Sequence, residues 1–94
     1  MFKMKFERVT EGEFYRLAES GGITDVILQE SQQSLNEFNV VGINSERGVA
    51  YAIRHGRVDE LRSWKRLDRL AIQLKEHGIL TFKVQFIQNK EQQA

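Results

Sequence analysis

Residues 38–53 read FNVVGINSERGVAYAI, and this stretch decides the fold. It holds two apolar, partly β-branched runs, residues 38–43 and 49–53, separated by the polar residues 44–48. Apolar runs of this length with Asn, Ser and Gly between them are typical of two strands joined by a tight turn. Gly48 can supply the positive φ that such a turn uses. The stretch therefore predicts a β-hairpin.

Upstream of the hairpin, the sequence predicts one short helix and one strand. Residues 10–13 read TEGE, which matches a capping box with Thr10 at the N-cap and Glu13 at N3. Apolar side chains follow at helical spacing, and Gly21 is suited to end the helix in the left-handed conformation. We expect a helix over residues 11–20. The β-rich residues 23–32 are expected to form a strand.

Downstream of the hairpin, four further elements are expected. His55 and Gly56 indicate a turn, and the alternating residues 57–64 indicate a fourth strand. Four apolar residues at i, i+3, i+4 and i+7 predict an amphipathic helix that begins near Leu67 and ends before Gly78. Residues 81–86 alternate cleanly and predict a final strand. The opening residues alternate too and indicate a short strand or an arm.

The expected architecture is a single α+β domain over residues 1–94, with a frayed tail at 87–94. The predicted order is (β)-α-β-β-β-β-α-β. Short turns between consecutive strands favour antiparallel neighbours, so we expect a four- to five-stranded, mainly antiparallel sheet. Both helices are expected on one face of it.

Composition argues against several functional classes. The chain has no cysteine, which excludes disulfides and thiolate metal sites. His55 and His77 lack a third metal ligand at suitable spacing, and no nucleophile elbow, P-loop or dinucleotide fingerprint is present. We therefore expect no enzyme activity, no cofactor and no metal. No apolar run is long enough for a membrane span, and the N-terminus does not resemble a signal peptide, so a cytoplasmic location is expected.

Charge is distributed unevenly although the net charge is only +1. Residues 1–30 carry an acidic excess, and residues 54–76 carry a basic one. The basic segment and the preceding strand supply the candidates for an interface or a nucleic-acid-binding surface: Tyr51, Arg54, Arg57, Arg62, Trp64, Lys65, Arg66 and Arg69.

Three interpretations of these residues compete. Arginines could follow a phosphate backbone while Trp64 stacks on a base. Tyr51, Arg62 and Trp64 are equally typical of a protein interface or a homodimer. The simplest interpretation is a solvated strand face, with Trp64 covering the core at the helix entry. The acidic first helix could dock a basic partner, including the basic segment of a second copy, or mimic phosphates.

Several motifs within residues 13–86 form a recognisable set: the turn at Arg54-His55-Gly56, the segment from Glu60 to Asp68, Gly78-Ile79 and residues 82–84. Together they resemble the small ParC-type partition-associated proteins of bacterial plasmids and mobile elements. The resemblance implies a non-enzymatic accessory protein of mobile DNA.

The sequence thus predicts a small non-enzymatic binding module of plasmid or mobile-element maintenance that acts on a protein partner or on itself. The first alternative is nucleic-acid binding through the basic surface of residues 54–69. The second is inhibition of a host defence nuclease complex. Replacing Trp64 by Ala or Arg62 by Glu is expected to weaken association more than folding.

Overall fold

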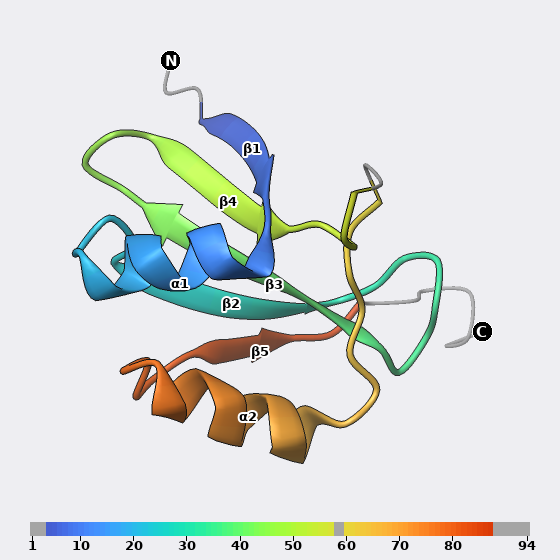
Figure 1. Ribbon diagram of the computed structural model, residues 1–94. Helices are drawn as coiled ribbons and strands as arrows, with labels where there is room; N and C mark the ends of the chain where they lie inside the picture. Colours follow the sequence, from blue (N-terminus) through green and yellow to red (C-terminus); the bar gives the residue numbers. More distant parts are fainter. Residues whose placement is uncertain (1–3, 58–59, 88–94) are drawn as a thin grey trace.

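The structure is a computed structural model that describes residues 4–57 and 60–87. Its helices and strands are shown in Figure 1 and follow one another in this order: β1 (Lys5–Val9), α1 (Glu11–Glu19), β2 (Asp25–Glu30), β3 (Phe38–Asn44), β4 (Val49–Ile53), α2 (Leu67–Glu76) and β5 (Lys83–Gln85).

The strands form one five-stranded sheet in the order β1-β4-β3-β2-β5. The central strands β2, β3 and β4 are antiparallel neighbours, as the hairpin pattern predicted. The outer strands are not, because β1 pairs with β4 and β5 pairs with β2 in parallel. The sheet is therefore mixed, and the expectation of a mainly antiparallel sheet is corrected. Helix α1 follows β1, and helix α2 precedes β5. Each helix carries the chain back along the sheet, so the strand after the helix runs in the same direction as the strand before it.

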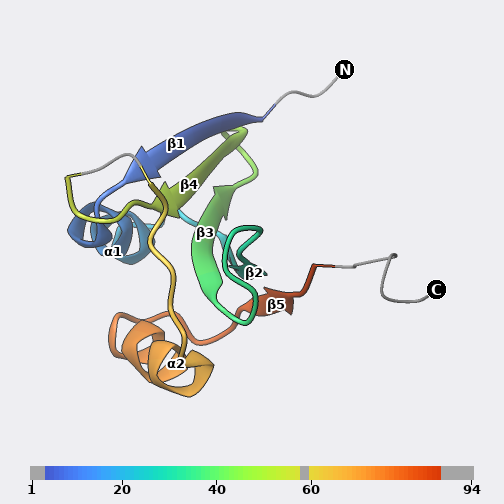
Figure 2. The same ribbon diagram turned by 90° about the vertical axis from the view of Figure 1, so that its right-hand side faces the viewer.

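Both helices lie on the same side of the sheet, as Figure 2 shows. Alternation along the strands turns Leu28, Val40 and Ile53 toward the helices, where all three are completely buried. Leu70 and Leu74 of α2 are buried against them. The prediction of a helix beginning at Leu67 is confirmed, because its apolar stripe packs on the sheet.

Helix α1 approaches the sheet closely at one glycine. A Cβ atom on Gly42 would lie 2.8 Å from Phe14 Cε2 and 2.7 Å from Ile23 Cδ1. Phe14 is completely buried. The missing side chain in β3 is therefore what lets α1 settle on the sheet at this depth. The predicted capping box also forms, with Glu13 N–H donating to Thr10 Oγ1 at 3.1 Å and Thr10 N–H to Glu13 Oε1 at 2.8 Å.

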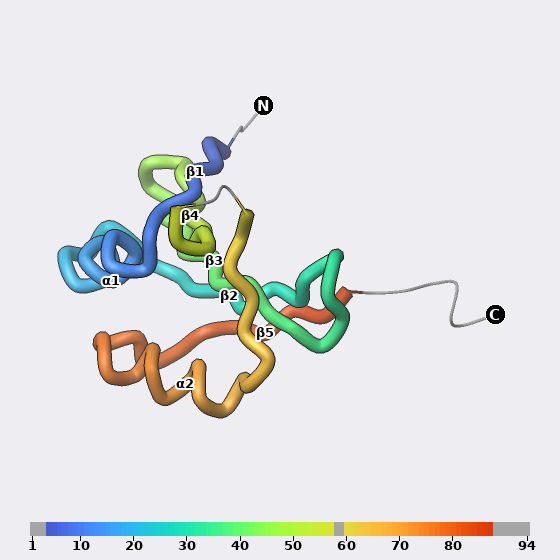
Figure 3. The backbone as a smooth tube through the Cα atoms, turned by 45° about the vertical axis from the view of Figure 1, so that its right-hand side comes forward, coloured from blue at the N-terminus to red at the C-terminus, as the bar shows by residue number. Residues whose placement is uncertain are grey.

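The predicted fourth strand at residues 57–64 is wrong for residues 57 and 60–64. Residues 58–59 lie outside the described part of the chain. Only isolated bridges form there, Arg54 with Leu61 and Phe38 with Trp64. After β4, the chain comes back alongside β3 at Trp64, which bridges to Phe38, and then runs on to α2 (Figure 3). Charged residues occur at alternating positions on both sides of this segment, so it offers no apolar face for burial in a sheet.

The chain ends also differ from expectation. Strand β5 is shorter than predicted, and Phe86 is 64% exposed although its ring meets Phe38 edge-on. The opening residues do form a strand, but Phe6 is 52% exposed rather than packed in the core. Ile87 N–H donates to the buried carboxylate of Glu30 at 3.0 Å. Residues 88–94 lie outside the described part.

Candidate functional site

The predicted site residues do not converge on one surface. Tyr51 lies in β4 on the side of the helices and is 9% exposed. Arg62 and Trp64 lie beside the beginning of β3, next to Phe38. The remaining members occupy the loop after β4 or the start of α2, and all but one of them are exposed: Arg54 (half-buried), Arg57, Lys65, Arg66 and Arg69.

Arg62 is held within the fold by two neighbours. Its guanidinium carbon lies 4.7 Å from the centre of the Trp64 ring, within the range of a cation–π contact. Its Nη1 atom donates to Glu11 Oε1 at 2.5 Å. Arg62 thus ties the segment after β4 to the first turn of α1.

Glu11 belongs to a polar network between the two helices, here called the helix seam and made of Glu11, Tyr15, Arg62, Gln73 and His77. The Tyr15 hydroxyl donates to Glu11 Oε2 at 3.3 Å. Gln73 donates to the Tyr15 oxygen at 2.9 Å and also to Glu11. The His77 ring stacks on Tyr15 with centroids 3.6 Å apart. Nearly every polar group in the seam is thereby used inside the protein.

Burial, and secondarily the negative charge of Glu11, raises the pKa of Tyr15 to about 12. The phenol therefore stays protonated near neutral pH and acts as a hydrogen-bond donor. His77 also lies 3.4 Å from Glu19, whereas His55 is exposed in a distant turn. Among residues 4–57 and 60–87, no group of three potential ligands is placed to hold a metal ion.

Two of the predicted basic residues, Arg66 and Arg54, have local partners within the protein. Arg66 forms an ion pair with Asp68, with Nη2 and Oδ2 2.9 Å apart, and this hydrogen bond lowers the pKa of Asp68. Arg54 donates to the backbone carbonyl of Gly56 at 3.2 Å. Several charges that could have faced a polyanion are therefore engaged locally.

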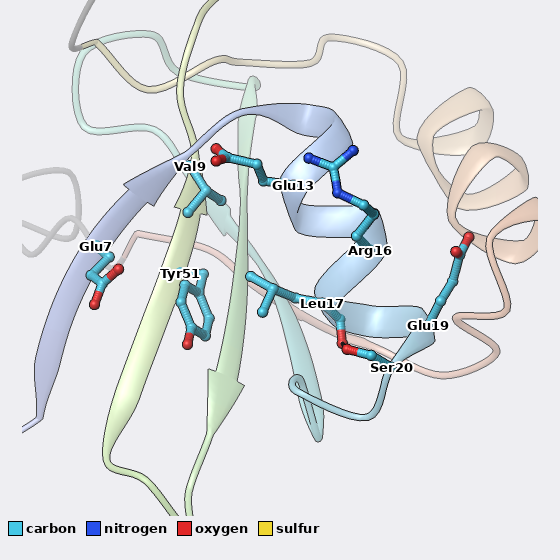
Figure 4. Close-up of a pocket in the computed structure, with 8 residues that line it drawn as sticks. All are labelled: Glu7, Val9, Glu13, Arg16, Leu17, Glu19, Ser20 and Tyr51. Carbon is cyan, nitrogen blue, oxygen red and sulfur yellow. Dashed lines mark hydrogen bonds between the residues drawn. The ribbon is translucent and has the colours of Figure 1, made fainter.

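An open groove of about 770 Å³ lies between α1 and the β1–β4 edge of the sheet (Figure 4). We call it the acidic groove. It is lined by Glu7, Val9, Glu13, Arg16, Leu17, Glu19, Ser20 and Tyr51.

Apolar groups form the floor of the acidic groove and charges form its rim. Val9 and Tyr51 are buried members of the core that face the groove, and Figure 4 shows Leu17 reaching toward the Tyr51 ring from α1. Three glutamates border this floor, opposed by a single cation, Arg16. Hydrogen bonds from the Thr10 backbone and hydroxyl lower the pKa of Glu13, so its carboxylate is ionised at neutral pH.

Two of the groove glutamates, Glu7 and Glu19, have weaker internal partners than Glu11. Glu7 lies 3.5 Å from Lys5 in an exposed pair, and Glu19 lies 3.4 Å from His77. The Ser20 hydroxyl donates to the Leu17 carbonyl at 3.2 Å, so no base is placed to activate it. The arrangement can attract a cationic, partly apolar ligand.

The sequence indicated Tyr51 and the acidic helix as candidates, but it did not indicate that they lie beside Glu7 and Val9 in one groove. These two residues reach the groove because β1 pairs with β4, a partner far along the chain. The alternation of Lys5, Glu7 and Val9 was the available signal, since it assigns them to one face of a strand. It does not say which strand lies alongside.

Comparisons with protein-family models, with curated proteins and with solved structures found no match to this chain. No helix in the described residues combines the length and the apolar composition needed to cross a membrane.

Proposed function

We propose that this protein is a small non-enzymatic binding module whose acidic groove receives a basic segment of a protein partner. The observation that carries the proposal is the combination of three rim glutamates with an apolar floor at Val9, Leu17 and Tyr51. Concave sites with an apolar base and a few placed charges are typical of ligand and peptide recognition.

The chemistry of the groove favours an extended segment in which Lys or Arg flanks an apolar side chain. The apolar side chain would contact Leu17 and Tyr51, while the cations would lie near Glu13 and Glu19. The rim is exposed, so each ion pair adds modest affinity and acts mainly on the encounter rate and on specificity. A dissociation constant in the micromolar range, about 10 μM, is expected.

The cellular role is a further part of the proposal. The resemblance of residues 13–86 to ParC-type partition-associated proteins supports an accessory role in plasmid or mobile-element maintenance in a bacterial cytoplasm. Three kinds of partner would present the required cations: a basic peptide segment of another protein, a second copy of this protein, and the nucleic-acid-binding groove of a defence nuclease. The inhibitor alternative therefore uses the same groove, through Glu13 and Glu19 and not through Glu11, which is engaged in the seam.

Nucleic-acid binding receives less support. Arg57, Lys65 and Arg69 are exposed, but Arg62 is engaged with Glu11 and Trp64, and Arg66 with Asp68. If the protein binds DNA or RNA, affinity will fall steeply with salt, because neutralised phosphates release counterions. A gel shift at low salt that disappears at moderate salt would favour this alternative over peptide binding.

The test is a titration with a ten-residue peptide that alternates Lys and Leu, followed by amide chemical shifts. The triple variant Glu7→Gln, Glu13→Gln and Glu19→Gln is expected to weaken binding about tenfold. Gln at position 13 preserves the capping box, since Gln also serves at N3. The folded state should therefore survive.

In the matched control, Gln replaces three other exposed glutamates that lie outside the groove, Glu46, Glu60 and Glu76. It changes the net charge by the same amount and should leave the affinity nearly unchanged. Equal weakening by both triple variants would show that only overall charge matters and would overturn the proposal. Shifts that avoid Leu17 and Tyr51 would overturn it as well.

A further inference from the structure

Strand β1 forms an outer edge of the sheet. In Figure 2 no described element lies beyond it on the side away from β4, and β1 has β4 as its neighbour in the sheet order. Edge strands present unpaired backbone groups, and these are a template for another strand. The question is whether the side chains of this edge permit or prevent such pairing.

The backbone of β1 presents an outward hydrogen-bonding pair at Phe6. Lys5 N–H donates to Gly48 O at 2.7 Å, and Arg54 N–H donates to Val9 O at 2.8 Å. In a parallel ladder alternate residues of a strand bond to the same neighbour. Residues 5, 7 and 9 therefore direct their backbone groups to β4. The N–H and C=O of Phe6 point away from β4, as does the Arg8 carbonyl, which accepts from Arg54 Nη1 at 3.5 Å.

Side chains at this edge alternate in chemistry as well as in direction. Lys5 and Glu7 point to the side of the helices, in register with Val49 and Tyr51. Phe6 points to the opposite side, where no described helix covers the sheet, and it is 52% exposed. Two opposite charges thus flank an exposed aromatic residue symmetrically.

We propose that two copies of this chain pair through β1 as antiparallel strands, with Phe6 opposite Phe6 of the partner subunit. This register places each Lys5 opposite Glu7 of the partner subunit. Phe6 is then a hydrogen-bonded pair, and Lys5 and Glu7 occupy the neighbouring non-hydrogen-bonded positions, where side chains approach most closely.

The charges select this register over its neighbours. Sliding the partner by two residues in one direction puts Lys5 opposite Lys5, and sliding it in the other direction puts Glu7 opposite Glu7. Like charges directly opposite each other destabilise a strand pair. A slip by one residue would turn the two helix-covered faces to opposite sides. The pattern Lys-Phe-Glu is therefore self-complementary only about Phe6.

The resulting dimer has a two-fold axis perpendicular to one continuous sheet. All helices lie on the same face, and the two acidic grooves border each other across the joined β1 strands. A partner with two basic segments could then occupy both grooves. The pairing itself does not depend on what the grooves bind.

The test is sedimentation velocity on the full chain from about 10 μM to about 1 mM, a range suited to an association through one short strand pair. The unmodified protein should show a reversible monomer–dimer equilibrium. Lys5→Glu and Glu7→Lys alone should each weaken association about tenfold or more, because each creates two like-charge pairs in the dimer. The double variant Lys5→Glu with Glu7→Lys should restore association to within about threefold of the unmodified protein.

Phe6→Pro is an independent test. It removes the outward N–H without removing any bond to β4, and proline is tolerated on an edge strand in this orientation. The variant should be monomeric, keep its unfolding midpoint nearly unchanged and still bind the basic peptide, so this outcome is separate from the fate of the groove proposal. A monomer at all concentrations for the unmodified protein, meaning that the charges only protect the edge, would overturn the inference. A dimer that tolerates Phe6→Pro or both single reversals would also overturn it.

Discussion

The helix seam and the acidic groove lie on two sides of the same short helix, and they use glutamate in opposite ways. Glu11 accepts hydrogen bonds from Arg62, Tyr15 and Gln73. Glu13, two residues later, accepts hydrogen bonds from the capping residue at the helix start and faces the groove. An acidic residue in a first helical turn is favourable in either case because of the helix dipole. Sequence position therefore does not separate the two uses.

The difference between the regions is their remaining capacity to bind something else. In the seam, the donors and acceptors are satisfied by one another, so a ligand would have to displace internal bonds and leave buried groups unpaired. In the groove, the carboxylates keep contact with solvent, and the partners of Glu7 and Glu19 are weak. Binding there exchanges water for cations at a smaller desolvation cost. The groove is the better candidate for recognition for this reason.

The largest effect is expected from a substitution at the contact between α1 and the sheet, because this contact positions both the helix seam and the acidic groove. Gly42→Ala places a methyl group 2.8 Å from Phe14 and 2.7 Å from Ile23, so α1 must shift outward. Overpacking of this kind costs about 1–3 kcal/mol of unfolding free energy, measured by urea titration. Seam and groove should both be disturbed, and amide shifts of α1 would report it.

Gly12→Ala is the matched control, since it adds the same methyl group to the exposed side of α1. The new Cβ would lie 3.8 Å from Arg16 Nη1, an ordinary contact. Stability should be unchanged or rise by up to about 1 kcal/mol, because alanine favours helix. Equal destabilisation by both substitutions would contradict the close approach at Gly42.

A smaller effect is expected when the seam alone is broken. Arg62→Glu removes the partner of Glu11 and places a second carboxylate beside it. The unfolding free energy should fall by about 1–2 kcal/mol, because both side chains are only partly exposed and solvent screens the rest. Arg66→Glu reverses the charge in an exposed pair and should leave the unfolding midpoint within error. A loss of stability in Arg62→Glu alone would show that Arg62 contributes to folding, whereas the sequence suggested an interface role. If Arg62→Glu kept its unfolding midpoint but lost association, Arg62 would instead be an interface residue.

The smallest effect is a pH dependence that belongs to the seam and not to the groove. The pKa of Tyr15 is raised from 10.0 to about 12, so the folded state holds this proton more tightly than the unfolded chain. The contribution is fully present below pH 10 and is lost as the pH rises toward 12. Between pH 9 and pH 11 the unmodified protein should lose roughly 1 kcal/mol more stability than Tyr15→Phe. Parallel pH profiles for the two proteins would mean that the phenol titrates normally.

Local signals predicted the elements that depend on local physics. The capping box at Thr10 and Glu13, the turn at Gly48 and the apolar stripe that begins at Leu67 each involve residues close in the chain, and the structure confirms them. The parallel outer strands could not be predicted in this way, because their partners are chosen by tertiary packing over the helices.

The errors at the candidate site have a similar cause. Alternation between residues 57 and 64 suggested a strand, but a strand in this sheet needs one apolar face, and charges occupy both. The acidic helix and Tyr51 were recognised separately. Their combination with Glu7 requires knowing that β1 lies beside β4. A long-range pairing therefore builds the groove from residues with no local signature.

The parallel placement of the outer strands also implies an order of assembly. Strands β2, β3 and β4 follow one another and can pair by closing short loops, whereas Lys5 must find Val49 and Lys83 must find Ile27. Closing long loops costs entropy before the contacts form, so distant pairings are slow. The central meander should form first and the outer strands last. Substitutions in β1 would then accelerate unfolding while leaving the refolding rate almost unchanged.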